Sequence, residues 1–386
     1  MYRVNEAGSS LIESCREIAT NGVASAAISV DTQAQFPESA IRSLADAGLL
    51  GLTLPAEVGG KGQTPSAFAA VVEELAQSCA STAMIYVMHI ASTQAIAASS
   101  TFGNRDALLT DIAAGQHLTT LAFSERGSRS QFWAPVSRLE ESADGGFVTS
   151  AQKSWVTSAS YADSYVSSAQ MPGAASPLES VLYLVDRKAE GVQIESGFDG
   201  LGLRGNDSSP VTLDNVNVPA NRLLTELGAG AGMMLEVVLP WFSVGTAAMA
   251  NGLCRAAVSA TAGHLAASRF EHQDSALRDL PTLRARLAEM SLQTEQSRAL
   301  LAHTAAAMEQ PDEQTPLFVL QSRLAAIQAA TDVTDLAMKA CGGAAFSKQL
   351  GIERLFRDAR AGWVMAPTAD HLKEFVGRAL TGLPLF

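Results

Sequence analysis

Residues 201–221 have the sequence LGLRGNDSSPVTLDNVNVPAN, and the second half of this stretch decides the fold class. Between Val211 and Val218 apolar and polar residues alternate, and Pro219 ends the run. Alternation with a period of two is typical of a β-strand, and a strand stops at proline because proline has no N–H to donate. The stretch therefore predicts a strand at the end of a β region.

Two segments before it also carry strand patterns. Residues 148–151 follow a glycine turn, and residues 180–185 (SVLYLV) form an apolar run bounded by polar residues. Several short strands separated by turn signals favour a small sandwich or barrel. We expect this β domain to occupy residues 118–224.

Helical patterns flank the β region on both sides. Before it, residues 1–117 carry apolar side chains at helical spacing, as between Phe68 and Leu75. After it, residues 225–386 contain long Ala- and Leu-rich segments with short connections, which predict a bundle. The predicted class is α+β, with an N-terminal helical domain, a middle β domain and a C-terminal four-helix bundle. The long segments cover residues 232–267, 280–308 and 314–340.

The composition favours a globular protein with a large core. The chain has 386 residues, of which 47% are hydrophobic and 17% charged. Its net charge of -12 argues against a nucleic-acid partner, because such proteins present a basic face. We expect no signal peptide and no run of about 18 uncharged apolar residues, and hence no membrane partner. Four widely spaced cysteines predict free thiols, no metal site and a cytoplasmic location.

Five segments in the same order resemble the acyl-CoA dehydrogenase family and together span nearly the whole chain. Residues 121–131 (LAFSERGSRSQ) are similar to the family's Thr-Glu-Pro-x-Ala-Gly-Ser-Asp loop. Residues 152–159 (QKSWVTSA) are similar to its Gly-x-Lys-x-Trp-Ile-Thr-Asn-Ala segment. The resemblance implies the family's three-part fold and an FAD-dependent oxidoreductase. The other matching segments are residues 36–62, 201–221 and 341–359.

The resemblance also implies roles for residues around the flavin. Trp155 is expected to pack on the isoalloxazine ring, Thr157 to hydrogen-bond it, and Ser124 to replace the loop threonine. Ser130 is expected to contact the ligand, an acyl thioester of CoA or of a carrier protein. The sequence does not identify the electron acceptor.

A second set of residues matches the family's contacts to FAD outside the flavin ring. Arg269 corresponds to the arginine that reaches the FAD pyrophosphate of a neighbouring subunit, a role that suits a bidentate guanidinium. Gly342 and Gly343 allow FAD to approach the backbone closely. Lys339 stands where a glutamine usually touches FAD, and Thr368 matches a threonine of the family. The resemblance implies a homodimer or homotetramer.

The base that removes the α-proton is where the sequence departs from the family. Counting from Arg357-Asp358-Ala359, the usual glutamate is replaced by Ala366, whose methyl group accepts no proton. Family branches with the base on the long helix carry it near Val238 in this numbering. If a helix begins at Pro367, Asp370 lies one turn beyond Ala366, and we expect it to be a buried, relocated base.

Three functions therefore stay open. The first is oxidation of an acyl thioester at its α and β carbons with a relocated base. The second is a flavin-dependent monooxygenase of the same fold, which needs no glutamate. The third is a non-basic subunit of a hetero-oligomer, in which a partner chain supplies the base.

Overall fold

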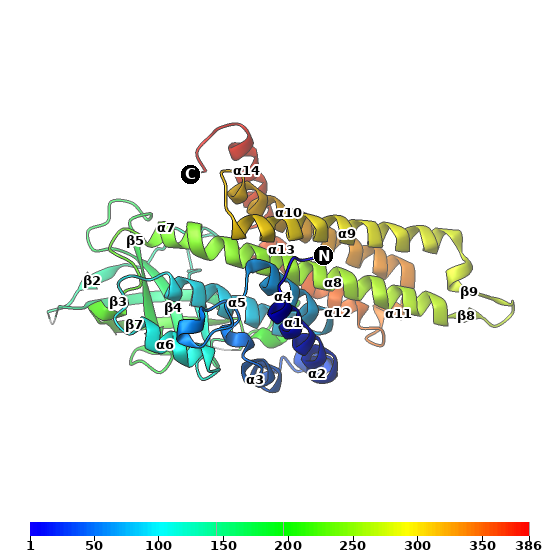
Figure 1. Cartoon of the computed structure of the whole chain (residues 1–386), viewed down its shortest axis with the longest axis horizontal. Helices are drawn as coiled ribbons and strands as arrows, with labels where there is room; N and C mark the ends of the chain where they lie inside the picture. The colour runs from blue at the N-terminus through cyan, green and yellow to red at the C-terminus, as the bar shows by residue number, and fades with distance from the viewer. Residues whose placement is uncertain (144, 196, 386) are drawn as a thin grey trace.

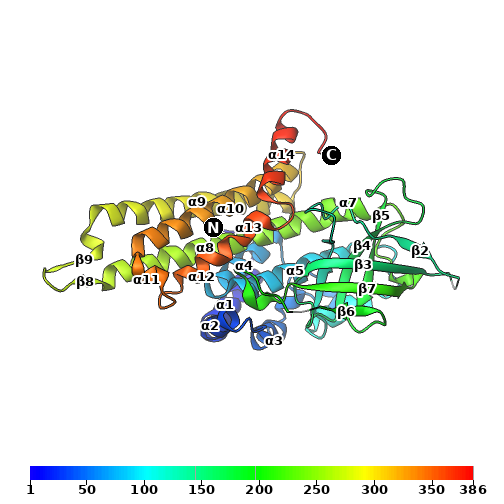
Figure 2. The ribbon, with the colours of Figure 1, turned by 180° about the vertical axis from the view of Figure 1, so that it is seen from behind.

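The computed structural model describes residues 1–143, 145–195 and 197–385. The chain is helical up to Ala113, forms two sheets between Thr119 and Val218, and is mainly helical from Gly230 onward, which confirms the predicted α+β class. Figures 1 and 2 show these strands gathered at one end of an elongated molecule, with the long C-terminal helices running to the other end.

Helix α5 (Ala80–Ala97) joins the three parts of the chain. It carries no Asp, Glu, Lys or Arg, and nearly all of its side chains are buried, as expected for a helix that is apolar on every face. It packs against both strand β1 and helix α8. The other helical segments of this domain are α1 (Glu6–Ile18), η1 (Ala19–Val23), α2 (Ala24–Thr32), α3 (Glu38–Asp46), η2 (Leu49–Gly51), η3 (Ala56–Val58), α4 (Pro65–Ser78) and α6 (Arg105–Ala113).

The middle domain consists of two sheets with the strand orders β1-β4-β5 and β2-β3-β7-β6. Side chains from both sheets, such as Tyr183 and Val211, form one shared core. The strands predicted at residues 148–151 and 180–185 are confirmed as parts of β3 and β5. The strands are β1 (Thr119–Ala122), β2 (Leu139–Glu141), β3 (Phe147–Val156), β4 (Ser164–Gln170), β5 (Ser180–Asp186), β6 (Val192–Ile194) and β7 (Ser209–Val218).

Strand β7 contains the alternating stretch and is confirmed, with one irregularity. Val211 and Leu213 point into the core, and Val216 and Val218 do so farther along. The inward positions change from odd to even numbers because the backbone bulges at Asn215, whose φ is +50°. A bulge inserts one residue and bends the strand while both halves keep their apolar face on the core.

Three long helices form the C-terminal bundle, close to the predicted bounds. They are α8 (Leu239–Ala267), α9 (Pro281–Glu309) and α10 (Thr315–Cys341). The remaining elements are η4 (Arg204–Asn206), η5 (Ala220–Arg222), α7 (Gly230–Gly232), the π-helical turn η6 (Met233–Val238), β8 (Arg269–Phe270), β9 (Ser275–Ala276), η7 (Leu277–Asp279), α11 (Gly343–Phe346), α12 (Ile352–Ala359), α13 (Ala361–Val364) and α14 (Ala369–Leu380).

The expectation that the chain lacks a long uncharged apolar run is wrong. The helix Gly230–Ala267 is long and apolar enough to cross a membrane by length and composition alone, and residues 237–254 carry no Asp, Glu, Lys or Arg. In the structure 61% of its most apolar window is buried inside the molecule. Helices α4, α5, α9 and α10 cover it, which is the usual situation of a core helix.

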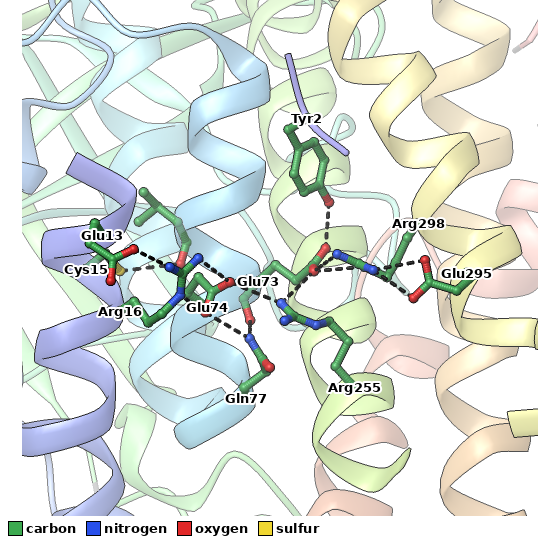
Figure 3. Close-up of polar contacts among 11 residues, drawn as sticks. Tyr2, Glu13, Cys15, Arg16, Glu73, Glu74, Gln77, Arg255, Glu295 and Arg298 are labelled. Carbon is green, nitrogen blue, oxygen red and sulfur yellow. Dashed lines mark hydrogen bonds and ion pairs between the residues drawn. The ribbon is translucent and has the colours of Figure 1, made fainter. Parts of the chain in front are cut away.

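Charged side chains tie the N-terminal domain to the bundle (Figure 3). Glu73 on α4 is 1% exposed and accepts hydrogen bonds from the Nη1 atom of Arg255 and the Nε atom of Arg298, both at 2.9 Å. The hydroxyl of Tyr2 donates to the same carboxylate at 2.8 Å. One buried carboxylate thus fixes the chain start, α4, α8 and α9 to one another.

Candidate functional site

A cavity of about 770 Å³ lies where the three parts of the chain meet. Buried apolar side chains form part of its lining, among them Met84 of α5, Phe123 and Val238. Its wall also includes the end of β3 and the segment from Arg357 to Ala366. Five of the residues expected at the flavin or substrate line it: Ser124, Ser130, Trp155, Thr157 and Ala366.

Trp155 is 66% exposed although it lies within strand β3. The pairing of β3 with β7 is irregular between Lys153 and Val156, and Trp155 has a left-handed φ of +57°. A left-handed backbone is strained for a bulky residue, and such strain gathers at functional sites. The indole is therefore held at the cavity instead of in the core, with Phe198 edge-on to it at 6.3 Å between ring centres. It presents a free aromatic surface to a planar ligand.

Polar groups next to the indole are ready to bind a cofactor. Thr157 is buried, and its Oγ1 atom lies 3.1 Å from the Oγ atom of Ser208. The Oδ1 atom of Asn206, also in the wall, is buried and has no hydrogen-bond partner among the described residues. A buried polar atom without a partner is costly, so this atom points to a polar ligand. The aromatic surface and these polar groups fit a flavin.

A buried ion pair that the sequence analysis missed fixes the loop beside the cavity. The Nζ atom of Lys153 lies 2.6 Å from the Oε1 atom of Glu125, and both side chains are almost fully buried. The Oε2 atom of Glu125 also accepts from the backbone N–H groups of Val136 (2.6 Å) and Ser137 (2.8 Å). Burial opposes ionisation of Glu125, but Lys153 and these donors outweigh it, so its pKa lies below the usual range. The sequence signal was present, because both residues lie inside the quoted motifs.

The mouth of the cavity is positively charged. Arg126 and Arg129 line it, are exposed and form no ion pair with a described residue. Arg360 lines it too, with its guanidinium carbon 3.8 Å above the ring centre of Phe356. Among the described wall residues the acidic one is Glu125, which Lys153 already neutralises. In a chain of net charge -12, this wall favours a ligand with an anionic end.

The expectation of a buried Asp370 is wrong. Its side chain is 87% exposed, pairs with Lys373 at 3.1 Å and does not line the cavity. The reason is where the helix begins: α14 starts at Ala369, with Thr368 as the N-cap that accepts from the N–H of His371. Ala366 is thus outside the helix, and the i, i+4 relation to Asp370 does not exist. Thr368 caps this helix and likewise lies outside the cavity lining.

The two positions that the resemblance implies for a carboxylate base, Ala366 and Val238, both line the cavity. Val238 is buried and ends the π-helical turn η6, in which an extra residue per turn shifts the register of the helix. Neither side chain accepts a proton. No free carboxylate and no imidazole occur among the described residues of the wall.

Four expected FAD contacts lie on or beside β8, the end of α10 and the start of α11, and Figure 1 shows β8 and α11 toward the end of the bundle that is opposite the sheets. Arg269 follows the 29-residue helix α8, which is about 43 Å long, while the cavity is at its first turns. Its side chain is 59% exposed and pairs with Asp274. Lys339, Gly342 and Gly343 lie at or just beyond the end of α10 and are exposed. Within one chain, these four residues therefore lie near one another and far from the cavity.

Three known proteins are similar to this chain over nearly its whole length. The human "Short-chain specific acyl-CoA dehydrogenase, mitochondrial" is 27% identical over 365 residues, which are 93% of this chain and 86% of the human protein. "Cyclohex-1-ene-1-carbonyl-CoA dehydrogenase" of Geobacter metallireducens is 26% identical over 381 residues, 98% and 99% of the two chains. The solved butyryl-CoA dehydrogenase from Megasphaera elsdenii superposes with a TM-score of 0.93 at 19% identity, over 99% of this chain and 100% of that one, which shows a shared fold.

Family models match three successive parts of the chain. The acyl-CoA dehydrogenase N-terminal domain matches residues 5–116, the middle domain residues 120–216 and the C-terminal domain residues 228–381. The cavity takes side chains from all three. With its helix–sheet–helix order and a site that fits a flavin, the chain belongs to the FAD-dependent acyl-CoA dehydrogenase family.

Proposed function

We propose that this protein binds an acyl thioester in the 770 Å³ cavity and oxidises it between its α and β carbons. The observation that carries the proposal is the lining of the cavity, which combines buried apolar side chains with exposed arginines. An acyl chain suits the apolar side chains, and the phosphates of CoA or of a carrier protein's prosthetic group suit Arg126 and Arg129.

The cofactor contacts follow from the wall. Trp155 provides the aromatic surface, Thr157 and Ser124 provide hydroxyl donors, and the Glu125–Lys153 pair keeps the loop in place. FAD, when bound, supplies the acceptor for the two electrons that leave the substrate. The buried apolar side chains of the lining, including Met84 and Phe123, exclude water from the acyl chain.

We also propose that the FAD site is shared between subunits of a homodimer or homotetramer. Its support is the separation of the cavity from Arg269, Lys339, Gly342 and Gly343, which lie at the opposite end of the bundle. The four free, buried cysteines support a reducing compartment such as the cytoplasm.

A second candidate is flavin-dependent oxygenation of the bound ligand. It is favoured by the lack of a free carboxylate or imidazole among the described wall residues, because oxygenation needs no base at Ala366. The same observation fits a hetero-oligomer in which a partner chain supplies the base.

An anaerobic titration of the FAD-loaded protein with a panel of acyl-CoAs separates these functions. Loss of the flavin's long-wavelength absorbance without oxygen is the expected result for thioester oxidation. If the spectrum stays intact with every thioester, and the protein forms an oxygen-dependent product once an external reductant is added, the result would favour oxygenation. The W155A variant, which lacks the aromatic surface, is the control for cofactor loading.

A further inference from the structure

Arg323 on helix α10 is a fully buried cation without a counter-ion. Its exposed fraction is 0%, and it forms no ion pair with any described carboxylate. Its Nε and Nη1 atoms have no hydrogen-bond partner among the described residues. Burial lowers the pKa of its guanidinium to about 9, so the group is still charged at neutral pH.

The side chain of Arg323 donates one hydrogen bond to a described residue, and that bond leads to the cavity wall. Its Nη2 atom donates to the carbonyl oxygen of Met365 at 3.1 Å. Its guanidinium carbon lies 4.8 Å from the ring centre of Phe242, which also lines the cavity. The charge is thus directly behind the wall, separated from the ligand space by Phe242 and Met365.

The carbonyl of Met365 and the N–H of Ala366 belong to the same peptide group. Ala366 lines the cavity, and its N–H donates no hydrogen bond to any described residue. A cation bound to the oxygen of a peptide group draws electron density from its nitrogen and makes its N–H a stronger donor. In the low dielectric of the interior this effect is not screened by water.

We propose that Arg323 is a positioning residue that polarises the Met365–Ala366 peptide, so that the N–H of Ala366 binds the carbonyl oxygen of the thioester more strongly. This role rests on the proposed thioester function. A more polarised carbonyl makes the α-hydrogen more acidic, so a weaker base suffices to remove it. The effect offsets in part the missing carboxylate at position 366.

A purely structural role explains Arg323 less well. Replacing a buried charge by an apolar side chain of similar volume is often neutral or stabilising, so packing alone does not require a guanidinium. A single hydrogen bond to Met365 does not require a charge either, because an amide donor provides one. What distinguishes arginine at this position is the uncompensated charge behind a peptide that faces the ligand.

Infrared difference spectroscopy of bound ligand tests the role directly. The FAD-loaded full-length protein is mixed with an acyl-CoA carrying ¹³C at the thioester carbonyl, and the carbonyl stretch is compared with that of free ligand. We expect a shift to lower frequency in the native protein, in which Arg323 keeps its charge, and a smaller shift in R323K, because burial without a partner favours the neutral form of lysine. R323M and R323Q are expected to lose most of this shift, although R323Q keeps an N–H donor. Their kcat is expected to fall about tenfold with little change in KM.

The outcomes separate this role from the proposed function. An unchanged carbonyl shift in folded R323M or R323Q would overturn the role of Arg323. Absence of any bound carbonyl band in the native protein would overturn thioester binding itself, and the role with it. Thermal unfolding identifies a structural effect: we expect R323M to melt no lower than the native protein, whereas a lower melting temperature together with an unshifted carbonyl band would make Arg323 structural. If one variant does not fold, the other still carries the test.

Discussion

Ala366 stands where the family resemblance implies a carboxylate, and it lines the cavity. We predict that A366E accelerates anaerobic flavin reduction by an acyl-CoA by about 100-fold, the usual contribution of a positioned general base. A366Q has the same shape without a proton acceptor and is the matched control. An A366E protein no faster than A366Q would show that proton removal does not limit the reaction.

Asp358 gives a prediction for the dependence of stability on pH. It is 4% exposed, accepts from the N–H of Leu203 at 2.7 Å, and burial raises its pKa from 3.8 to about 6. Between these values the folded protein holds a proton that the unfolded chain has released, so the Asp358 contribution to stability falls as the pH rises from about 4 to about 6.

The D358N variant removes this titration and keeps an acceptor for Leu203. Above pH 6 it should be more stable than the native protein by an amount on the order of 2–3 kcal/mol, and the difference should vanish near pH 4. Urea unfolding of both proteins at pH 4.5 and pH 7.5 measures the difference. Equal differences at the two pH values would mean that Asp358 does not titrate in this range.

Single residues were also where sequence reasoning failed most. Nothing near Arg323 in the sequence predicts a buried, unpaired cation, because its burial is produced by α8 and by the segment before α14, which are distant in sequence. The misplacement of Asp370 arose from one capping residue, Thr368, which moved the helix start beyond Ala366. Trp155 was placed at the ligand by motif alone, since its left-handed backbone has no local sequence signal.

At the scale of elements, the long helices and the strand β7 could be predicted because their apolar periodicity is local. Strand β4 could not. All seven of its residues are buried, so it shows no alternation, and four of them are serine or glutamine. No local sequence pattern predicts the π-helical turn η6 either. Its extra residue per turn shifts the register of the long helix, and the position near Val238 was counted without this shift.

The network of Figure 3 predicts how firmly the elements are joined. E73Q should lower the free energy of unfolding by about 3 kcal/mol, because it leaves two arginines facing a neutral amide. E295Q is the control: Glu295 pairs with Arg298 as well, but its side chain is 51% exposed, so its loss should cost less than about 1 kcal/mol. Urea unfolding measures both. Equal losses would show that burial of Glu73 contributes nothing.

At the scale of the whole molecule, helix α8 separates the two halves of the expected FAD site, so subunits should complement one another. A chain with R269Q has an intact cavity, but the distal end of its bundle, which carries Arg269, is damaged. A chain with W155A has an intact distal end and a damaged cavity. We predict that each alone loses FAD on gel filtration, while the two co-expressed with different tags recover part of the bound flavin. Only sites that pair the native cavity with the native arginine are complete.

The matched control combines two distal variants at one position, R269Q and R269A. Every site in that mixture has a damaged distal end, so no flavin should be recovered. Recovery in the control, or none in the first mixture, would contradict a site shared between subunits. Residue patterns within one chain do not predict this arrangement, which only the family resemblance implied, through Arg269.

The exposed indole of Trp155 has an optical consequence. The chain has four tryptophans, all in the described part, and Trp155 is the one with a largely exposed side chain. An isoalloxazine ring placed against Trp155 accepts the excitation energy of the indole and quenches its fluorescence. The intrinsic fluorescence of the purified protein therefore gives a label-free measure of cofactor loading before any turnover is assayed.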